Sequence, residues 1–198
     1  MNVLSSIASI YITLMSVIFA GVMNMVFTKT SLYRRNNRPI DKGRILSDGR
    51  RLFGDNKTVN GFIGMTVSGG LAQMILGAVC SFVPSMERCN RLYEAFPNTL
   101  AVNLFTGLFF GFAYALFELP NSFIKRRIGI HDGKTGSGAV GVLFFIIDQI
   151  DSLIGVALCL SVLCRISVWE YFGCLLVGAF THIAVNLILY KLRIRRNI

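Results

Sequence analysis

The stretch SGAVGVLFFIIDQIDSLIGVALCLSVLC, residues 137–164, places two acids inside an apolar run long enough to cross a membrane. Asp148 and Asp151 are its only charged residues. A helix needs about 20 apolar residues to span the hydrocarbon core, and an ionised acid at that depth is costly and usually functional. Because residues three apart share one helical face, the two carboxylates form the first candidate site. The alternative is a structural pair that faces a Lys or Arg of another span.

The whole chain is apolar in the same way, with 54% hydrophobic and only 15% charged residues among 198, too apolar for an ordinary soluble domain. Residues 137–147 lengthen the fourth apolar run beyond one untilted crossing, and a re-entrant or interfacial piece is one interpretation of them. The glycines, including the GxxxG of Gly107 and Gly111, are interpreted as sites of close helix packing. The predicted spans are 3–27, 61–84, 99–117, 147–165 and 169–190.

Basic residues give these spans a direction. Of the 20 Lys and Arg residues, nine lie in 29–60, four in 118–138 and four after the last predicted span. The positive-inside rule then predicts an outside N-terminus and an inside C-terminus. The predicted fold is a single all-α membrane domain over 1–198. It has five transmembrane helices, cytoplasmic loops at about 28–60 and 118–147, and a cavity on the cytoplasmic side.

The five cysteines do not suggest a metal or disulfide framework. None forms a CxxC pair, and four lie in apolar runs, so we interpret them as small buried hydrophobes. They are Cys80, Cys89, Cys159, Cys164 and Cys174.

The first basic segment ends in GDNKT, residues 54–58, directly before a predicted span. Lys57 and Thr58 would place a charge and a hydroxyl at a helix N-terminus, where backbone N–H groups favour phosphate. The sequence is not a Walker A motif. The alternative is a basic loop attracted to anionic lipid headgroups.

The second basic segment reads FELPNSFIKRRIGIHDGKTGSG, residues 117–138. Lys125 and Arg126 are suited to phosphates, whereas Glu118 and Asp132 could join the two intramembrane acids around a cation. Mg²⁺ takes one or two carboxylates together with substrate phosphate oxygens. The segment therefore predicts polyphosphate binding.

These motifs resemble the signature of the CTP-dependent phosphatidate cytidylyltransferase superfamily: a Ser, Lys-Arg, four residues, Lys-Asp, and later Asp-x-x-Asp-Ser. His131 and Glu118 depart from it, standing where the superfamily has Lys and Asp. The GDNKT loop, the small size and the five spans are similar to the CDP-archaeol synthase branch. The matching residues are Ser122, Lys125, Arg126, Asp132, Asp148, Asp151 and Ser152.

The resemblance implies transfer of CMP from CTP to a membrane lipid phosphate, with release of pyrophosphate and Mg²⁺ as cofactor. The enzyme would lie in the cell membrane with its site facing the cytoplasm. Its partners would be CTP, the lipid phosphate and the bilayer, without nucleic acid, and a homodimer is left open. The lipid is also left open, between an archaeal ether lipid phosphate and a diacyl lipid phosphate such as phosphatidate. A metal ion, and not a Lys or Arg of another span, is then expected to neutralise the acids.

The implied roles fall into three sets. Catalysis is assigned to Lys125, Asp148 and Asp151, and metal binding to Glu118, Asp148 and Asp151. Nucleotide or phosphate binding is assigned to Asp55, Lys57, Thr58, Ser122, Lys125, Arg126 and Asp132.

Two alternatives stay open at this point. The chain could be a non-enzymatic membrane protein, such as a small channel, a transporter or an assembly protein, whose acids line a pathway. It could also be a CTP-dependent lipid kinase, which would transfer the γ-phosphate and leave CDP. Product identity separates the kinase from the cytidylyltransferase.

Overall fold

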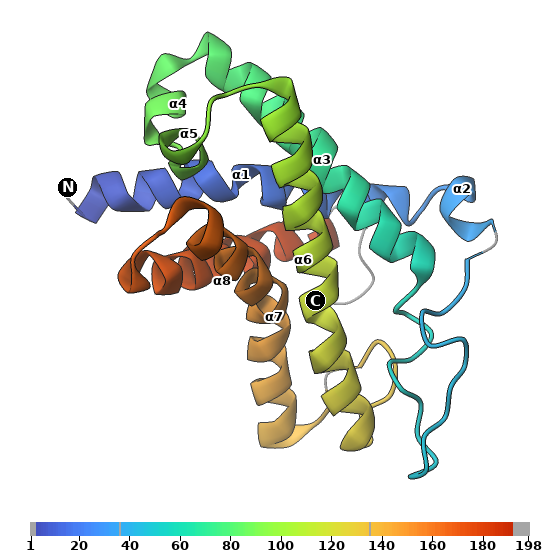
Figure 1. Cartoon of the computed structure of the whole chain (residues 1–198). Coiled ribbons are helices and arrows are strands. Elements are labelled where there is room, and N and C mark those ends of the chain that lie inside the picture. Colours follow the sequence, from blue (N-terminus) through green and yellow to red (C-terminus); the bar gives the residue numbers. More distant parts are fainter. Residues whose placement is uncertain (1–2, 36, 135, 192–198) are drawn as a thin grey trace.

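The computed structural model describes residues 3–35, 37–134 and 136–191, most of which are helical (Figure 1). Five of the described helices are long and apolar enough to cross a membrane, which confirms the predicted all-α fold with five spans. The orientation stays a prediction, and the basic tail after residue 191 lies outside the described residues. The helices are α1 (Val3–Phe27), α2 (Ser31–Arg34), α3 (Val59–Phe82), α4 (Pro84–Cys89), α5 (Arg91–Ala95), α6 (Leu100–Arg127), α7 (Gly138–Cys164) and α8 (Val168–Lys191).

The long helices form a bundle with loops gathered at one end. Helix α3 packs along α6, α6 along α7, and α1 contacts both α3 and α8. In Figure 1 the lower ends of α6 and α7 run side by side, and the loop between α2 and α3 lies next to the end of α6. The short helices α4 and α5 lie at the opposite end. This arrangement brings the two basic segments together.

Glycines set the close approach of α3 and α6. A β-carbon at Gly111 would lie 2.5 Å from the Met65 carbonyl oxygen, and one at Gly69 would lie 2.9 Å from the Gly111 Cα atom. Without side chains at these positions the two backbones come into contact, as small residues allow in membranes. The predicted packing role of the GxxxG pair is confirmed.

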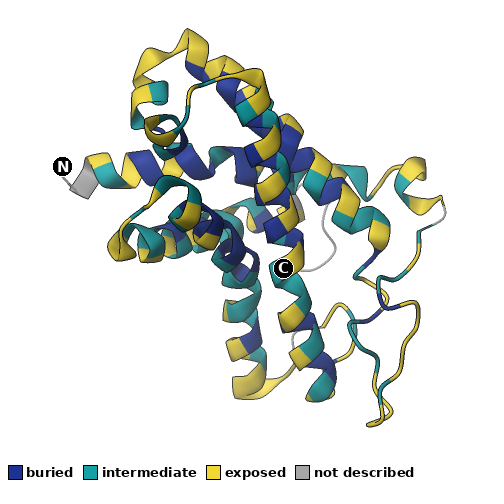
Figure 2. Cartoon of the chain, viewed as in Figure 1, coloured by how far each residue is buried: buried dark blue, intermediate teal, exposed yellow. Residues whose placement is uncertain are grey.

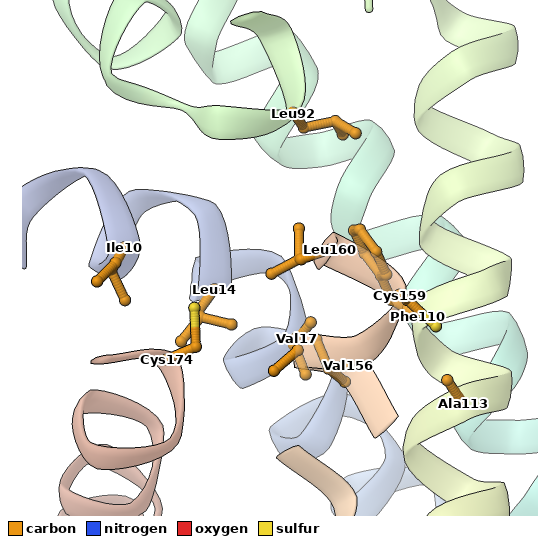
Figure 3. Packing of buried hydrophobic residues seen from close by; sticks show 11 residues of the cluster. Ile10, Leu14, Val17, Leu92, Phe110, Ala113, Val156, Cys159, Leu160 and Cys174 are labelled. Carbon is orange, nitrogen blue, oxygen red and sulfur yellow. The ribbon is translucent and has the colours of Figure 1, made fainter. Parts of the chain in front are cut away.

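A buried apolar cluster joins the helices away from the loops. Leu14, Phe110, Val156 and Leu160 are almost fully buried and come from α1, α6 and α7, with Leu92 of α5 above them (Figure 3). In Figure 2 the buried residues follow the seams between helices. The core fixes the helices relative to one another close to the polar residues described below.

The outer helix faces are apolar as well. Val67, Leu71 and Ile75 on α3 are exposed at a spacing of four residues, and similar residues cover the other long helices. In water such faces would be large exposed apolar patches, whereas lipid tails match them. The chain is a multi-pass membrane protein.

Two spans are longer than predicted. Helix α6 continues past residue 117 and through Pro120 to Arg127, and α7 begins at Gly138 instead of residue 147. The re-entrant interpretation of 137–147 is wrong, because this apolar segment contains no proline or charge and simply extends the helix. The second loop, predicted over 118–147, therefore shrinks to 128–137. Lys125 and Arg126 lie on a helix and not in a loop.

Candidate active site

A polar cavity of about 430 Å³ lies where the long helices meet the two basic segments. Helix α6 contributes three of its charged residues, and α7 faces it with Asp148 and Asp151. Helices α1 and α8 supply polar side chains, among them Asn24 and His182. The cavity therefore combines acids, bases and amides from segments far apart in the chain.

The two acids of α7 are linked to α6 by one lysine and one amide. The Lys125 ammonium donates to both carboxylate oxygens of Asp148 at 2.5 Å. The Asn121 side-chain nitrogen donates to Asp148 at 2.7 Å and to Asp151 at 2.6 Å. The other Asp151 oxygen accepts the Ser152 backbone N–H at 2.6 Å. Asn121 thus holds the two carboxylates close together.

The sequence of α6 explains this geometry. Glu118, Asn121, Ser122 and Lys125 are spaced three, four and seven residues from the first, so they share one helical face. All four line the cavity, and Ser122 and Lys125 are buried. The continuation of the helix beyond Pro120 is what aligns them.

The loop before α3 closes another side of the cavity. The Lys57 ammonium forms an ion pair with Glu118 of α6. Burial disfavours a charged lysine, but the carboxylates of Glu118, Asp151 and Asp148 outweigh it and raise the pKa of Lys57. Lys57 is therefore a cation held among three acids.

Asp41 organises this loop from within. Its carboxylate accepts hydrogen bonds from Arg51 at 2.7 Å and from the backbone N–H groups of Phe53, Gly54 and Gly43 at 3.0, 3.1 and 3.0 Å. Burial disfavours the charged carboxylate, but these bonds outweigh it and hold the pKa of Asp41 well below its usual range. The turn that carries Lys57 is built around this buried anion.

Asp132 joins the two basic segments to each other. Its carboxylate forms an ion pair with Arg126 and accepts the Asp55 backbone N–H at 2.6 Å. Gly54 has a backbone φ of +106°, and a β-carbon there would collide with the Asp132 carboxylate. Arg127 adds a second link to Asp48 at 2.9 Å.

The structure brings most of the predicted site residues into one cavity: Glu118, Lys57, Ser122, Lys125, Arg126, Asp148 and Asp151 all line it. The other three have contacts outside its lining. Asp55 pairs with Arg51 at 2.7 Å, and the Thr58 hydroxyl caps α3 by accepting the Gly61 N–H at 3.1 Å. Asp132 bridges the segments as described above. Their contact with a nucleotide stays a prediction.

One expectation about the acids is wrong. No Lys or Arg of another span is predicted to pair with the two acids, yet Lys125 of α6 pairs with Asp148. The reason is the extension of α6, which carries Lys125 alongside α7. Lys125 therefore has an acid partner as well as its predicted phosphate. Neutralisation by a metal ion stays a prediction.

The residues nevertheless fit a divalent cation. Within the described ranges no group of three or more His, Cys, Asp or Glu side chains is placed to hold a metal alone. Mg²⁺ commonly takes only one or two carboxylates and completes its shell with water and phosphate oxygens. Asp148 and Asp151 supply two, and the buried Asn121 Oδ1 atom has no hydrogen-bond partner among the described residues. All five cysteines are free thiols.

Several cavity residues were missed from the sequence. Asn121, Asn24 and Tyr114 line the cavity, as do His182 and Asn186 of α8. The i, i+3 and i, i+4 spacings to Glu118 and Lys125 could have identified Asn121. The polar positions of α1 and α8 give no motif, and only their placement inside apolar spans marks them.

Known proteins resemble this chain along most of its length. The model of the family CarS-like, CDP-archaeol synthase, matches residues 5–197. The CDP-archaeol synthase of Methanospirillum hungatei is 31% identical over 169 residues, which cover 80% of this chain and 87% of that protein. The CDP-archaeol synthase of Methanoculleus marisnigri is 39% identical over 121 residues, and this match spans 59% of each protein.

A solved structure, described as an intramembrane enzyme for archaeal membrane lipids biosynthesis, shares the fold. It superposes with a TM-score of 0.62 at 20% identity and covers 89% of this chain and 92% of its own. The family match confirms the predicted enzyme class, a CTP-dependent cytidylyltransferase of membrane lipids, in which nucleotidyl transfer is metal-dependent. The chain belongs to the CarS-like family of CDP-archaeol synthases.

Proposed function

We propose that this protein transfers CMP from CTP to the phosphate group of an archaeol-type ether lipid, giving a CDP-activated lipid and pyrophosphate. The observation that carries the proposal is the Lys125, Asp148, Asn121 and Asp151 arrangement inside a cavity lined by further cations. The names of the CDP-archaeol synthase relatives support the choice of lipid.

The reaction is a displacement at the α-phosphorus of CTP. An oxygen of the lipid phosphate forms a bond to this phosphorus, the bond to the oxygen bridging α and β breaks, and pyrophosphate leaves with that oxygen. No covalent enzyme intermediate is required, so the protein contributes positioning and charge stabilisation. Lys57, Lys125 and Arg126 line the cavity and would carry the positive charge that faces the phosphates.

Asp148 and Asp151 of α7 would hold Mg²⁺, together with Glu118, which lines the cavity from α6. When bound, the ion would offset charge on the CTP phosphates. Lys125 would then exchange its pairing with Asp148 for a phosphate oxygen. Asn121 would keep the two carboxylates in place throughout, because it contacts both of them.

A second cavity of about 80 Å³ continues from the polar cavity into the apolar part of the bundle. Leu14, Val17 and Ile18 of α1 and Leu153 of α7 line it, which suits a hydrocarbon chain and not a nucleotide. Gly21 lines both cavities, so they adjoin. This apolar cavity would hold the part of the lipid chain nearest its phosphate.

The proposal places the polar cavity at the cytoplasmic face of the cell membrane, where CTP is available. The support is the concentration of Lys and Arg in the segments that surround the cavity. Residues 1–198 would act as one unit.

The test uses the purified protein in nanodiscs with CTP, Mg²⁺ and a panel of lipid phosphates, including archaeol-type and diacyl forms. The proposal expects pyrophosphate release that depends on both the lipid phosphate and the metal, fastest with the archaeol-type lipid. Release with only the diacyl lipid would overturn the assigned lipid. No release with any lipid would overturn the enzymatic proposal and favour the channel or transporter alternative.

A further inference from the structure

The polar cavity and the apolar cavity share a boundary, to which α1 and α8 each supply two residues. Five residues line both cavities: Gly21, Met25, Tyr114, His182 and Asn186. The two from α8 are spaced i, i+4, so they share one face of this helix. The other α8 residues of the apolar cavity, Gly178, Thr181 and Val185, do not line the polar one. His182 and Asn186 are therefore the α8 residues at which the lining of the apolar cavity meets that of the polar cavity.

These polar groups lie inside a span. Helix α8 is apolar enough to cross a membrane over Val168–Ile188, and both residues fall within that range. Ionisable or amide side chains at this depth are costly and usually mark a substrate path. A contact between helices partly explains why Asn186 is tolerated inside the span. Its side-chain amide donates to Gln149 of α7 at 3.5 Å, a long hydrogen bond. His182 borders both cavities.

In the proposed reaction the lipid substrate occupies both cavities, with its phosphate in the polar one and its hydrocarbon chain in the apolar one. Its phosphate must face Lys125 and the two acids, whereas its chain must leave through the apolar lining. The junction of phosphate and chain therefore falls at the shared boundary, where the apolar lining lowers the local dielectric and strengthens a hydrogen bond to the phosphate. His182 places an imidazole ring at that boundary.

We propose that His182 positions the lipid substrate by donating a hydrogen bond to its phosphate or to the adjoining backbone oxygens, with Asn186 one turn further along. This inference rests on the proposed function. His182 is not among the residues proposed to face the CTP phosphates, which come from α6 and the loop before α3. It is a positioning residue for the lipid and not a source of the chemistry.

The test measures steady-state kinetics in nanodiscs with two substrates varied separately, CTP and the archaeol-type lipid phosphate. His182→Leu should raise the KM for the lipid phosphate about tenfold, the worth of one lost hydrogen bond to a charged group. The KM for CTP should stay within about twofold. His182→Gln, which keeps a donor, should recover most of the loss.

The matched control introduces the same residue on the lipid-facing side of the same helix. Phe180→Leu, at a position 73% exposed, should change neither KM. If His182→Leu does not fold, His182→Asn carries the test, because its shorter side chain keeps polarity but not reach, and its lipid KM should rise.

An unchanged lipid KM, or an equal rise in both KM values, would overturn the role of His182 while wild-type turnover still supports the proposed function. Absence of CDP-lipid from the wild-type protein would overturn the proposed function itself, and this inference with it.

Discussion

The Lys125 ammonium contacts both carboxylate oxygens of Asp148 at 2.5 Å, across the seam between α6 and α7. The lysine side chain is 10% exposed and the aspartate 27%, so solvent screens the pair only in part. A phosphate entering the cavity would compete with Asp148 for Lys125, and a metal ion would compete with Lys125 for Asp148. The ion pair therefore links the two helices and also sits at the centre of the proposed chemistry.

Asp148→Asn should reduce turnover by at least about 100-fold, because it removes a metal-binding charge and leaves Lys125 without its anion. CDP-lipid formation at saturating CTP measures this. Glu87→Gln removes one negative charge from α4 at the opposite end of the bundle and should leave turnover unchanged. Near-normal activity of the Asp148 variant would remove this residue from the metal site.

Asn121→Leu should lower metal affinity or turnover by about 10- to 100-fold, the usual effect of removing a group that orients metal ligands. Titration of activity with Mg²⁺ measures it, and the half-saturating concentration should rise. Asn103→Leu offers a control on the same helix, because Asn103 is also buried and hydrogen-bonded but lies far from the acids. It should lower thermal stability without shifting the Mg²⁺ dependence.

Gly54→Ala should separate the two basic segments, because its β-carbon would occupy the place of the Asp132 carboxylate. The expected result is weaker CTP binding, measured by calorimetry with Mg²⁺ present. Gly49→Ala is the control: Gly49 also has a positive φ, +74°, but no atom lies within 4 Å of the added carbon. It should cost about 1 kcal/mol of local strain and keep CTP affinity. Equal affinities for the two variants would contradict the role of Asp132.

Asp41→Asn should destabilise the loop before α3 at neutral pH, because it weakens the charge-assisted bonds to Arg51 and three backbone N–H groups by about 1.5–3 kcal/mol. The pKa of Asp41 is lowered in the folded protein, so its contribution is present above the unfolded value near 4. It is lost as the pH falls through the folded value. Thermal unfolding of wild type and variant should therefore differ at pH 7 and converge progressively below about pH 4. A difference that stays constant with pH would contradict the proposed charge effect.

The sequence predicted the fold well because membrane spans are defined by composition. The apolar runs and the basic segments were enough to identify five helices, and GDNKT, KRR and DQID were enough to suggest the chemistry. The end of α6 was misplaced because Glu118 and Pro120 resemble the end of a helix. The start of α7 was misplaced because its apolar run is longer than one untilted crossing needs. In the structure the polar face from Glu118 to Lys125 is covered by α7 and the loops, which favours continuing the helix.

The contacts between segments were beyond prediction from the sequence. Lys125 was assigned to phosphate, yet its place opposite Asp148 depends on how α6 and α7 cross. Asp132 was assigned to the nucleotide, whereas it binds Arg126 and the Asp55 N–H. His182 and Asn186 belong to no sequence motif. Their proposed role follows only from their position in the lining of both cavities.

The most direct test of the central claim follows the phosphorus atoms of CTP. Parallel reactions use CTP labelled at the α-phosphate and CTP labelled at the γ-phosphate, with the archaeol-type lipid phosphate in nanodiscs. The account predicts that the α label enters the lipid and the γ label leaves as pyrophosphate. Transfer of the γ label to the lipid, with CDP as the other product, would show a lipid kinase and contradict it.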